Sequence, residues 1–201
     1  MNAPPFAPKC LCLDIETAVD DVFSIYKVAG WRADTGAAVS LAGPSLRSSI
    51  DKLDDITDGA AFLLGHNIVR HDLLALAKVF PSLKLNQLPA VDTLELSPIT
   101  FPANPYHSLV KDYKLVRDAR SDPLKDAKLA LKLWRDQYLA FETLKASAPE
   151  ELACYHFFLT RDNATGMGSF FAKLRGAMPP KADEVRAAVV RLTTGKVCPQ
   201  Q

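Results

Sequence analysis

The sequence predicts an α/β protein with a mixed β-sheet flanked by helices and with extra C-terminal helices. The first apolar segment, Cys10–Ile15, is nearly continuous, as in a strand buried on both faces. Segments with strand character come first and then alternate with segments of helical spacing, which is typical of a sheet covered by helices. The chain has 201 residues, 48% of them hydrophobic, and this is enough to form the core of one domain.

The expected elements follow the hydrophobic pattern along the chain. Strands are expected at residues 10–16, 23–32, 37–41, 61–64 and 90–94. Helices are expected at residues 46–56, 69–80, 106–113, 124–144, 150–159 and 181–192, and the tail after residue 149 has room for two or three helices in total. The helix over 69–80 should end before Pro81, because proline disfavours helical backbone at the residue that precedes it.

These elements suggest three parts. Residues 1–9 form a flexible, proline-rich lead, residues 10–145 form the α/β domain, and residues 146–201 form a helical extension packed on the same domain. The last residues show no obvious natural stop. An ordinary frayed terminus and a piece of a longer protein are equally compatible with them.

Composition narrows the class of protein. The net charge of +1 does not indicate a nucleic-acid partner, although a nuclease needs only a local basic rim around an acidic site. The four cysteines lack the spacing of a zinc site and are expected to be small core residues of a reducing compartment. No signal peptide is recognisable, and no segment approaches the roughly twenty apolar residues that span a bilayer. We expect a soluble, cytoplasmic protein without membrane contact.

Asp14 and Glu16 are the most informative pair of residues. Side chains two residues apart on a strand point to the same face. The two carboxylates therefore project from the same face of an otherwise apolar segment. Burying two like charges is costly unless a cation neutralises them, and oxygen ligands suit Mg²⁺ or Mn²⁺. The pair alone does not decide between two interpretations. Either both side chains bind a metal ion, or Asp14 caps a loop and Glu16 is solvated at the end of the strand.

A third carboxylate, Asp72, follows the strand that ends at Gly65. An acidic side chain in the first turn of a helix is stabilised by the helix dipole, so Asp72 has a purely structural interpretation. His66 and His71 can likewise be interpreted as ordinary polar loop residues without a catalytic role. The functional interpretation is that Asp72 faces Asp14 and Glu16 across the end of the sheet.

A fourth carboxylate, Asp126, lies one turn into the long amphipathic helix. Asp122 followed by Pro123 is a typical helix start, which makes Asp122 more a cap than a catalyst. Asp126 lies at the edge of the apolar stripe and could reach inward to a metal ion. Lys125 beside it could compensate charge or contact phosphate.

Taken in order, these segments resemble the DEDD superfamily of 3′→5′ exonucleases, which has a ribonuclease H-like fold. LDIET matches the first motif, GHNIVRHD the second and SDPLKDAKLALKLW the third, and PAVDTLEL resembles the strand between the last two. The ordered set covers roughly residues 10–145. Residues 106–118 and 122–131 also resemble the exonuclease-type N-terminal domain of some bacterial RecQ-type helicases.

The resemblance implies a metal-dependent exonuclease that hydrolyses phosphodiester bonds of single-stranded DNA by a two-metal-ion mechanism with Mg²⁺ or Mn²⁺. Asp14 would bridge both ions, Glu16 and Asp126 would complete one site, and Asp72 would hold the second ion partly through water. The residues expected to contact substrate are Thr17, His66, Asn67 and Lys125. For Asn67, bracing the loop is the slightly preferred interpretation.

The residue at the position of the general base differs from the pattern of the resembling superfamily. Where the superfamily has a His or a Tyr, this chain has Ser121 or Asp122. His107 is a substitute candidate and His71 another, although a polar cap is at least as good an interpretation of His107. A non-catalytic or weakly active nucleic-acid-binding module of a larger helicase-like protein, an exoribonuclease and a structural domain therefore stay as alternatives. A partner polypeptide could dock on the C-terminal helices.

Two further groups of residues bear on substrate binding. A basic-leaning run could follow a nucleic-acid strand or be a solvated face: Lys111, Lys114, Arg117, Arg120, Lys125 and Lys128. Four aromatic residues could stack on bases, with core packing preferred for most of them: Phe23, Tyr26, Trp31 and Tyr106.

Overall fold

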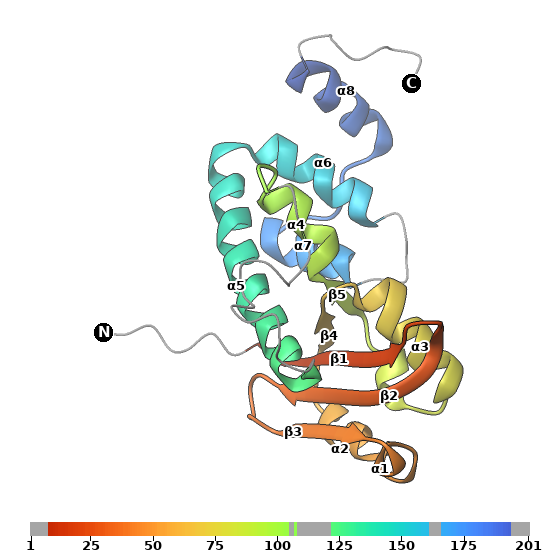
Figure 1. Ribbon diagram of the computed structural model, residues 1–201. Helices are drawn as coiled ribbons and strands as arrows, with labels where there is room; N and C mark the ends of the chain where they lie inside the picture. The colour runs from red at the N-terminus through yellow and green to blue at the C-terminus, as the bar shows by residue number, and fades with distance from the viewer. Residues whose placement is uncertain (1–7, 105–106, 108–121, 161–165, 194–201) are drawn as a thin grey trace. The chain divides into compact units, whose positions relative to one another are not determined.

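The computed structural model describes residues 8–104, 107, 122–160 and 166–193 (Figure 1). It is an α/β structure with a five-stranded mixed sheet flanked by helices. Contacts divide the chain into two compact units, Met1–Arg135 and Asp136–Gln201, which we call the sheet unit and the helical unit. The division falls inside the long helix α5, Pro123–Ser147.

The sheet unit holds all five strands. They are β1 Cys10–Ala18, β2 Asp21–Arg32, β3 Ala38–Ala42, β4 Phe62–Gly65 and β5 Ala90–Asp92. Between the strands and before α5 lie α1 Pro44–Ser48, α2 Lys52–Thr57, the π-helix η1 Ile68–Asp72, α3 Leu73–Val79, the 3₁₀-helix η2 Lys84–Gln87 and α4 Thr93–Thr100. The helical unit contains the rest of α5 with α6 Pro149–Thr160, α7 Met167–Arg175 and α8 Ala182–Leu192.

The strand order in the sheet is β3-β2-β1-β4-β5. β2 pairs antiparallel with both β1 and β3, while β1, β4 and β5 run parallel to one another. The carboxyl ends of β1, β4 and β5 therefore lie at the same edge of the sheet. In open α/β sheets this edge is where binding sites commonly form.

The two faces of the sheet differ in character. Leu11, Leu13 and Ile15 of β1 belong to a buried core that includes residues of the helices following β3 and β4, such as Leu53 and Leu76. The alternate β1 residues point to the other face, where the start of α5 packs. The ring of Phe62 on β4 lies 5.7 Å from the ring of Trp134 on α5, and the same face carries Asp14 and Glu16.

Arg32, at the end of β2, joins this strand to α2. Its guanidinium is buried and donates two hydrogen bonds of 2.9 Å to the carboxylate of Asp34. It also donates to the backbone carbonyls of Ile56, at 3.0 Å, and Asp58, at 2.6 Å. These carbonyls end a helix and have no intrahelical partner, so a buried cation at this point completes their hydrogen bonding.

Most of the expected elements are confirmed with shifts of a few residues. All five strands are present, and the helix before Pro81 ends at Val79 after a π-helical first turn. The helix expected over 46–56 is wrong as a single element, because α1 ends at Ser48 and α2 begins at Lys52. The Ser48 hydroxyl bonds back to the carbonyls of Pro44 and Ser45, which competes with helix continuation.

The strand expected over 90–94 was also predicted too long. β5 ends at Asp92, whose side chain accepts the N–H of Leu94 at 2.9 Å and caps α4. This capping begins a helix where the sequence suggested a strand followed by a loop. The helix expected over 106–113 lies outside the described residues, apart from His107.

The helical unit has its own apolar contacts. Phe141 of α5 packs edge-on against Phe170 and Phe171 of α7, with ring centroids 5.8 and 5.2 Å apart. Cys154 of α6 packs with Val185 and Ala188 of α8. Within the described ranges, no helix of either unit is both long enough and apolar enough to cross a bilayer.

Candidate metal centre

Three carboxylates from two distant segments meet on the α5 face of the sheet. Asp14 and Glu16 leave β1 together, as their spacing predicts, and Asp126 approaches from the first turn of α5. One oxygen from each side chain can be chosen so that all three lie within 4.8 Å of one another. Asp126 is buried, whereas Asp14 and Glu16 are half-buried.

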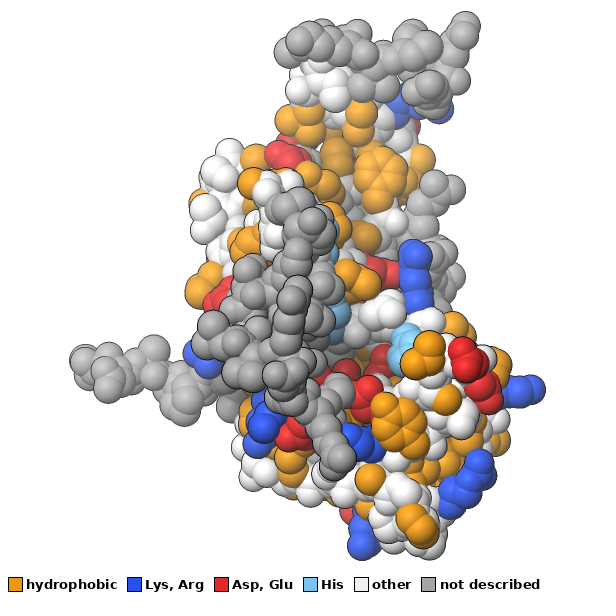
Figure 2. Space-filling view, viewed as in Figure 1, with side chains coloured by type: hydrophobic (Ala, Val, Ile, Leu, Met, Phe, Trp, Pro, Cys, Tyr) orange, Lys and Arg blue, Asp and Glu red, His pale blue; other side chains and the backbone are white. Residues whose placement is uncertain are grey.

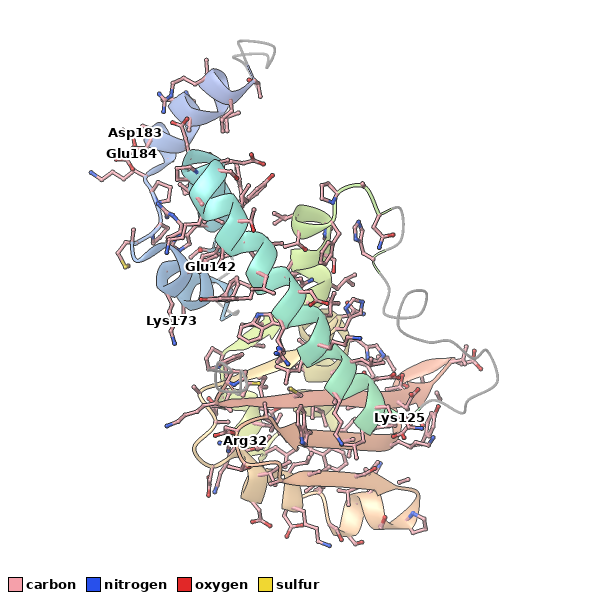
Figure 3. The ribbon with its side chains drawn as sticks, turned by 90° about the vertical axis from the view of Figure 1, so that its left-hand side faces the viewer. Arg32, Lys125, Glu142, Lys173, Asp183 and Glu184 are labelled. Carbon is pink, nitrogen blue, oxygen red and sulfur yellow. The ribbon has the colours of Figure 1, made fainter. Side chains whose placement is uncertain are left out.

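The start of α5 positions Asp126. The Oδ1 atom of Asp122 accepts the N–H of Leu124 at 3.2 Å, so Asp122 acts as a helix cap, as the sequence indicated. The helix then lies over the strands, with Lys125 at its exposed beginning (Figure 3). The ammonium of Lys128 lies 5.5 Å from the ring centroid of Trp31 on β2, which fixes this turn of α5 above β2.

The donor set of this cluster suits a hard divalent cation. Three carboxylate oxygens are the ligand type that Mg²⁺ and Mn²⁺ prefer. Three like charges held this close repel one another in a partly desolvated site, and a bound cation would offset that repulsion. Figure 2 shows acidic side chains gathered over β1 and β2, with a histidine and Lys or Arg side chains beside them.

Asp72 lies next to this cluster but is not one of its three converging residues. Its Oδ1 accepts the backbone N–H of Ile15, the residue between Asp14 and Glu16, at 2.9 Å. Its Oδ2 lies 3.3 Å from Nδ1 of His71. Burial raises the pKa of the Asp72 carboxyl, and the hydrogen bond from His71 opposes this shift.

His71 links Asp72 to the end of β1. Its other ring nitrogen, Nε2, lies 3.3 Å from the hydroxyl of Thr17. The hydrogen bond to Asp72 raises the pKa of His71, and the nearby charge of Glu16 acts in the same direction. In its charged form the imidazolium donates from both nitrogens, so it ties η1 to the segment of β1 that carries the carboxylates.

The contact between His71 and Asp72 predicts a pH-dependent stability. A histidine whose pKa is higher in the folded state binds more protons when folded, so its stabilising contribution is complete below the ordinary value of about 6.5 and is lost as pH rises through the raised folded pKa. Because the side chain is 33% exposed, the loss should be below about 1 kcal/mol. Urea unfolding with chelator, from pH 5.5 to 8.5, should show this fall in wild type and a flatter profile in His71→Gln. Identical profiles would contradict the assignment.

Asp92 holds the loop between β4 and η1 and was missed by the sequence analysis. Its Oδ1 accepts the N–H of Asn67 at 2.8 Å as well as that of Leu94, and its Oδ2 accepts the N–H of Val69 at 3.1 Å. Asn67 itself has a left-handed backbone with φ of 63°, which supports the interpretation that it shapes the loop. The signal was an Asp followed three residues later by Glu95, a typical helix start.

Replacing Asp92 by alanine should destabilise the sheet unit by about 2–4 kcal/mol, because three backbone N–H groups lose their acceptor in a buried place. Asp92→Asn keeps one carbonyl acceptor and should lose less. Equilibrium urea unfolding followed by tryptophan fluorescence measures both, since Trp31 and Trp134 lie in the sheet unit. A change below 1 kcal/mol for Asp92→Ala would show that the three hydrogen bonds are dispensable.

Other predicted substrate-contacting residues lie at the same edge or near it. Nδ1 of His66 lies 2.9 Å from the hydroxyl of Thr93, and burial lowers the pKa of His66. A hydrogen bond joins His66 to the backbone of His107, whose Nδ1 is buried without a partner among the described residues. Lys125 is exposed, and its ammonium lies 3.6 Å from the carboxylate of Asp122.

Several predictions concern residues that the structure does not describe. They are Ser121, Tyr106, and the basic residues Lys111, Lys114, Arg117 and Arg120. Among the described aromatics, the preference for core packing is wrong for Phe23 and Tyr26, which are 45% and 46% exposed. Both lie on β2 near its turn to β1.

The sequence matches no protein-family model and no curated protein.

Proposed function

We propose that the chain is a metal-dependent 3′→5′ exonuclease that hydrolyses phosphodiester bonds of single-stranded DNA with two divalent cations, Mg²⁺ or Mn²⁺. The observation that carries the proposal is the convergence of Asp14, Glu16 and Asp126 to within 4.8 Å from segments more than a hundred residues apart. The mixed sheet, with β2 antiparallel to its neighbours, supports the ribonuclease H-like fold of the resembling superfamily.

Each acidic residue has a role in this proposal. Asp14, Glu16 and Asp126 would hold one cation, and Asp14 with Asp72, the latter partly through water, would hold the second. When bound, the two cations would activate water and offset the charge that develops on the leaving 3′ oxygen. Asp72 would also fix the backbone of Ile15, which keeps Asp14 and Glu16 pointed at the substrate.

Lysines near the carboxylate cluster support a polyanionic substrate. Lys125 and Lys128 lie on the exposed side of the same helix that supplies Asp126, and Lys27 on β2 is paired with Glu16 in the sheet register. An acidic cluster with lysines beside it attracts a phosphodiester backbone while retaining the cations that the reaction requires. This charge pattern does not distinguish DNA from RNA, so the exoribonuclease is tested beside the DNA enzyme.

One observation favours a second candidate, a weakly active or non-catalytic nucleic-acid-binding module of a larger helicase-like protein. Asp122 stands where part of the resembling superfamily has its tyrosine, and its carboxylate is committed to the start of α5 and to Lys125. A side chain that caps a helix is poorly placed to accept a proton from water. In this candidate, the helical unit would dock the larger polypeptide.

The test is an assay with 5′-labelled single-stranded DNA and with RNA of the same sequence. With Mg²⁺ or Mn²⁺ the proposal expects a ladder that shortens from the 3′ end, and with chelator it expects intact substrate. A 3′-labelled substrate should release labelled mononucleotide from the first turnover, which fixes the direction. Binding of the oligonucleotide without cleavage in either metal would favour the second candidate, and neither binding nor cleavage would overturn both.

A further inference from the structure

β2 contains one extra residue beside the candidate metal centre. Lys27 pairs with Glu16 and Ile25 pairs with Thr17, so Tyr26 opposes no residue of β1. This arrangement is a β-bulge, a feature that breaks the alternation of side chains and often lies next to active sites. Its effect here is to change the direction of the side chain at position 26.

The contacts of the flanking residues show where Tyr26 points. Ile25 packs against the core formed by Leu11, Leu13 and Ile15, on the face opposite to the carboxylates. Lys27 pairs with Glu16 and therefore shares its face. The ammonium of Lys27 lies 5.9 Å from the ring centroid of Tyr26, so the ring accompanies Lys27 and not Ile25.

The ring of Tyr26 is therefore an exposed aromatic surface at the edge of the acidic cluster. Its residue is 46% exposed, although an aromatic side chain of a sheet is normally covered by neighbours. One side of the ring is near the Lys27 ammonium, and the exposed remainder can be contacted from solvent. Exposed hydrophobic side chains next to acidic ones are visible over this part of the sheet unit in Figure 2.

We propose that Tyr26 is a stacking platform for an unpaired base of the strand whose phosphodiester lies at Asp14, Glu16 and Asp126, with Lys27 close to the adjoining phosphate. This inference rests on the proposed function and specifies its substrate as a strand with unstacked bases. A flat ring beside a cation matches a nucleotide, which offers a base to stack and a phosphate to pair. A base in a duplex is stacked on its neighbours and would not be available to Tyr26.

The test compares binding of a normal oligothymidylate with one that carries abasic residues at its three 3′-terminal positions. Binding is measured by fluorescence anisotropy in Ca²⁺, which permits metal-dependent binding without rapid cleavage. Wild type should bind the normal strand about fivefold to 150-fold more tightly than the abasic one, the range expected for stacking one base on an aromatic side chain. Tyr26→Ala should lose this preference, and Tyr26→Phe should keep it.

Phe158→Ala is the matched control, because Phe158 is a similarly exposed aromatic residue (52%) that lies on α6 of the helical unit. It should bind like wild type. Circular dichroism and Mn²⁺ binding by calorimetry should be unchanged in all three variants, which separates loss of stacking from loss of folding.

The outcomes distinguish this inference from the proposed function. Cleavage by wild type with an unchanged base preference in Tyr26→Ala would overturn the stacking role and leave the exonuclease in place. An equal loss in Phe158→Ala would also overturn it, since the loss of base preference would then not be specific to Tyr26. Base-dependent binding that requires Tyr26, without any cleavage, would support the platform and count against the nuclease.

Discussion

Asp14→Asn should reduce metal-dependent hydrolysis of single-stranded DNA by about a thousandfold or more, while the protein stays folded. The substitution keeps the size of the side chain but removes one of the three charges that converge within 4.8 Å. Weakening the hold on a cation removes several kcal/mol of transition-state stabilisation, and each 1.36 kcal/mol is a factor of ten in rate.

The same substitution should also act on stability, in a direction that depends on the cation. With chelator, removing a like charge from the cluster should leave the melting temperature unchanged or raised, because repulsion falls. With Mn²⁺, wild type should gain melting temperature and Asp14→Asn should gain little, because only a protein that binds the ion is stabilised by it. Thermal unfolding with and without Mn²⁺ measures both effects.

Asp20→Asn is the matched control for this experiment. Asp20 is exposed in the turn between β1 and β2 and carries the same charge as Asp14. Its replacement should leave both the rate and the Mn²⁺ stabilisation at wild-type values. If Asp14→Asn kept full Mn²⁺ stabilisation, the three carboxylates would not be the cation site.

Arg32→Ala should destabilise the sheet unit by about 2–4 kcal/mol, because a buried side chain is lost and its hydrogen-bond acceptors are left without their donor. The buried guanidinium makes two hydrogen bonds to Asp34 and one each to the carbonyls of Ile56 and Asp58. After truncation, these oxygen atoms lose their donor, and the residues Asp34 and Ile56 are only partly open to solvent. Urea unfolding followed by tryptophan fluorescence measures the loss.

Two variants show whether burial is the cause. Lys84→Ala removes an ion pair with Asp58 that is exposed on both sides, and its effect should be small. Arg32→Lys keeps the charge but has a single nitrogen in place of the planar fork, so it should recover only part of the stability. If Arg32→Ala and Lys84→Ala lowered the free energy of unfolding by similar amounts, the hydrogen bonds of the buried Arg32 would contribute no more than an exposed ion pair.

The sequence predicted the local features of the site. The alternation of side chains on a strand placed Asp14 and Glu16 on one face, and this holds because residue spacing on a strand depends only on backbone geometry. The start of α5 was equally readable, since Asp122 and Pro123 carry the chemistry of a helix start in adjacent residues. Both features depend on residues a few positions apart.

Features that depend on contacts between distant segments were harder to predict from the sequence. Asp92 appeared as an ordinary residue of a strand, because its partners Asn67 and Val69, at the beginning of η1, lie more than twenty residues earlier in the chain. Arg32 gave no signal, because its acceptors are backbone carbonyls at a helix end more than twenty residues later in the chain. The bulge at Tyr26 is a property of the register between β1 and β2, and neither strand shows it alone.

By itself, then, the sequence determined which side chains share a strand face or a helix turn, because backbone periodicity is a local property. It determined the carboxylate pair on β1, the beginning of α5 and most of the strands. The tertiary structure decided that Asp126 comes within 4.8 Å of that pair and that Asp72 binds the backbone of Ile15. Those distances are set by how α5 and η1 pack on the sheet, and packing depends on the summed contacts of many residues far apart in the chain.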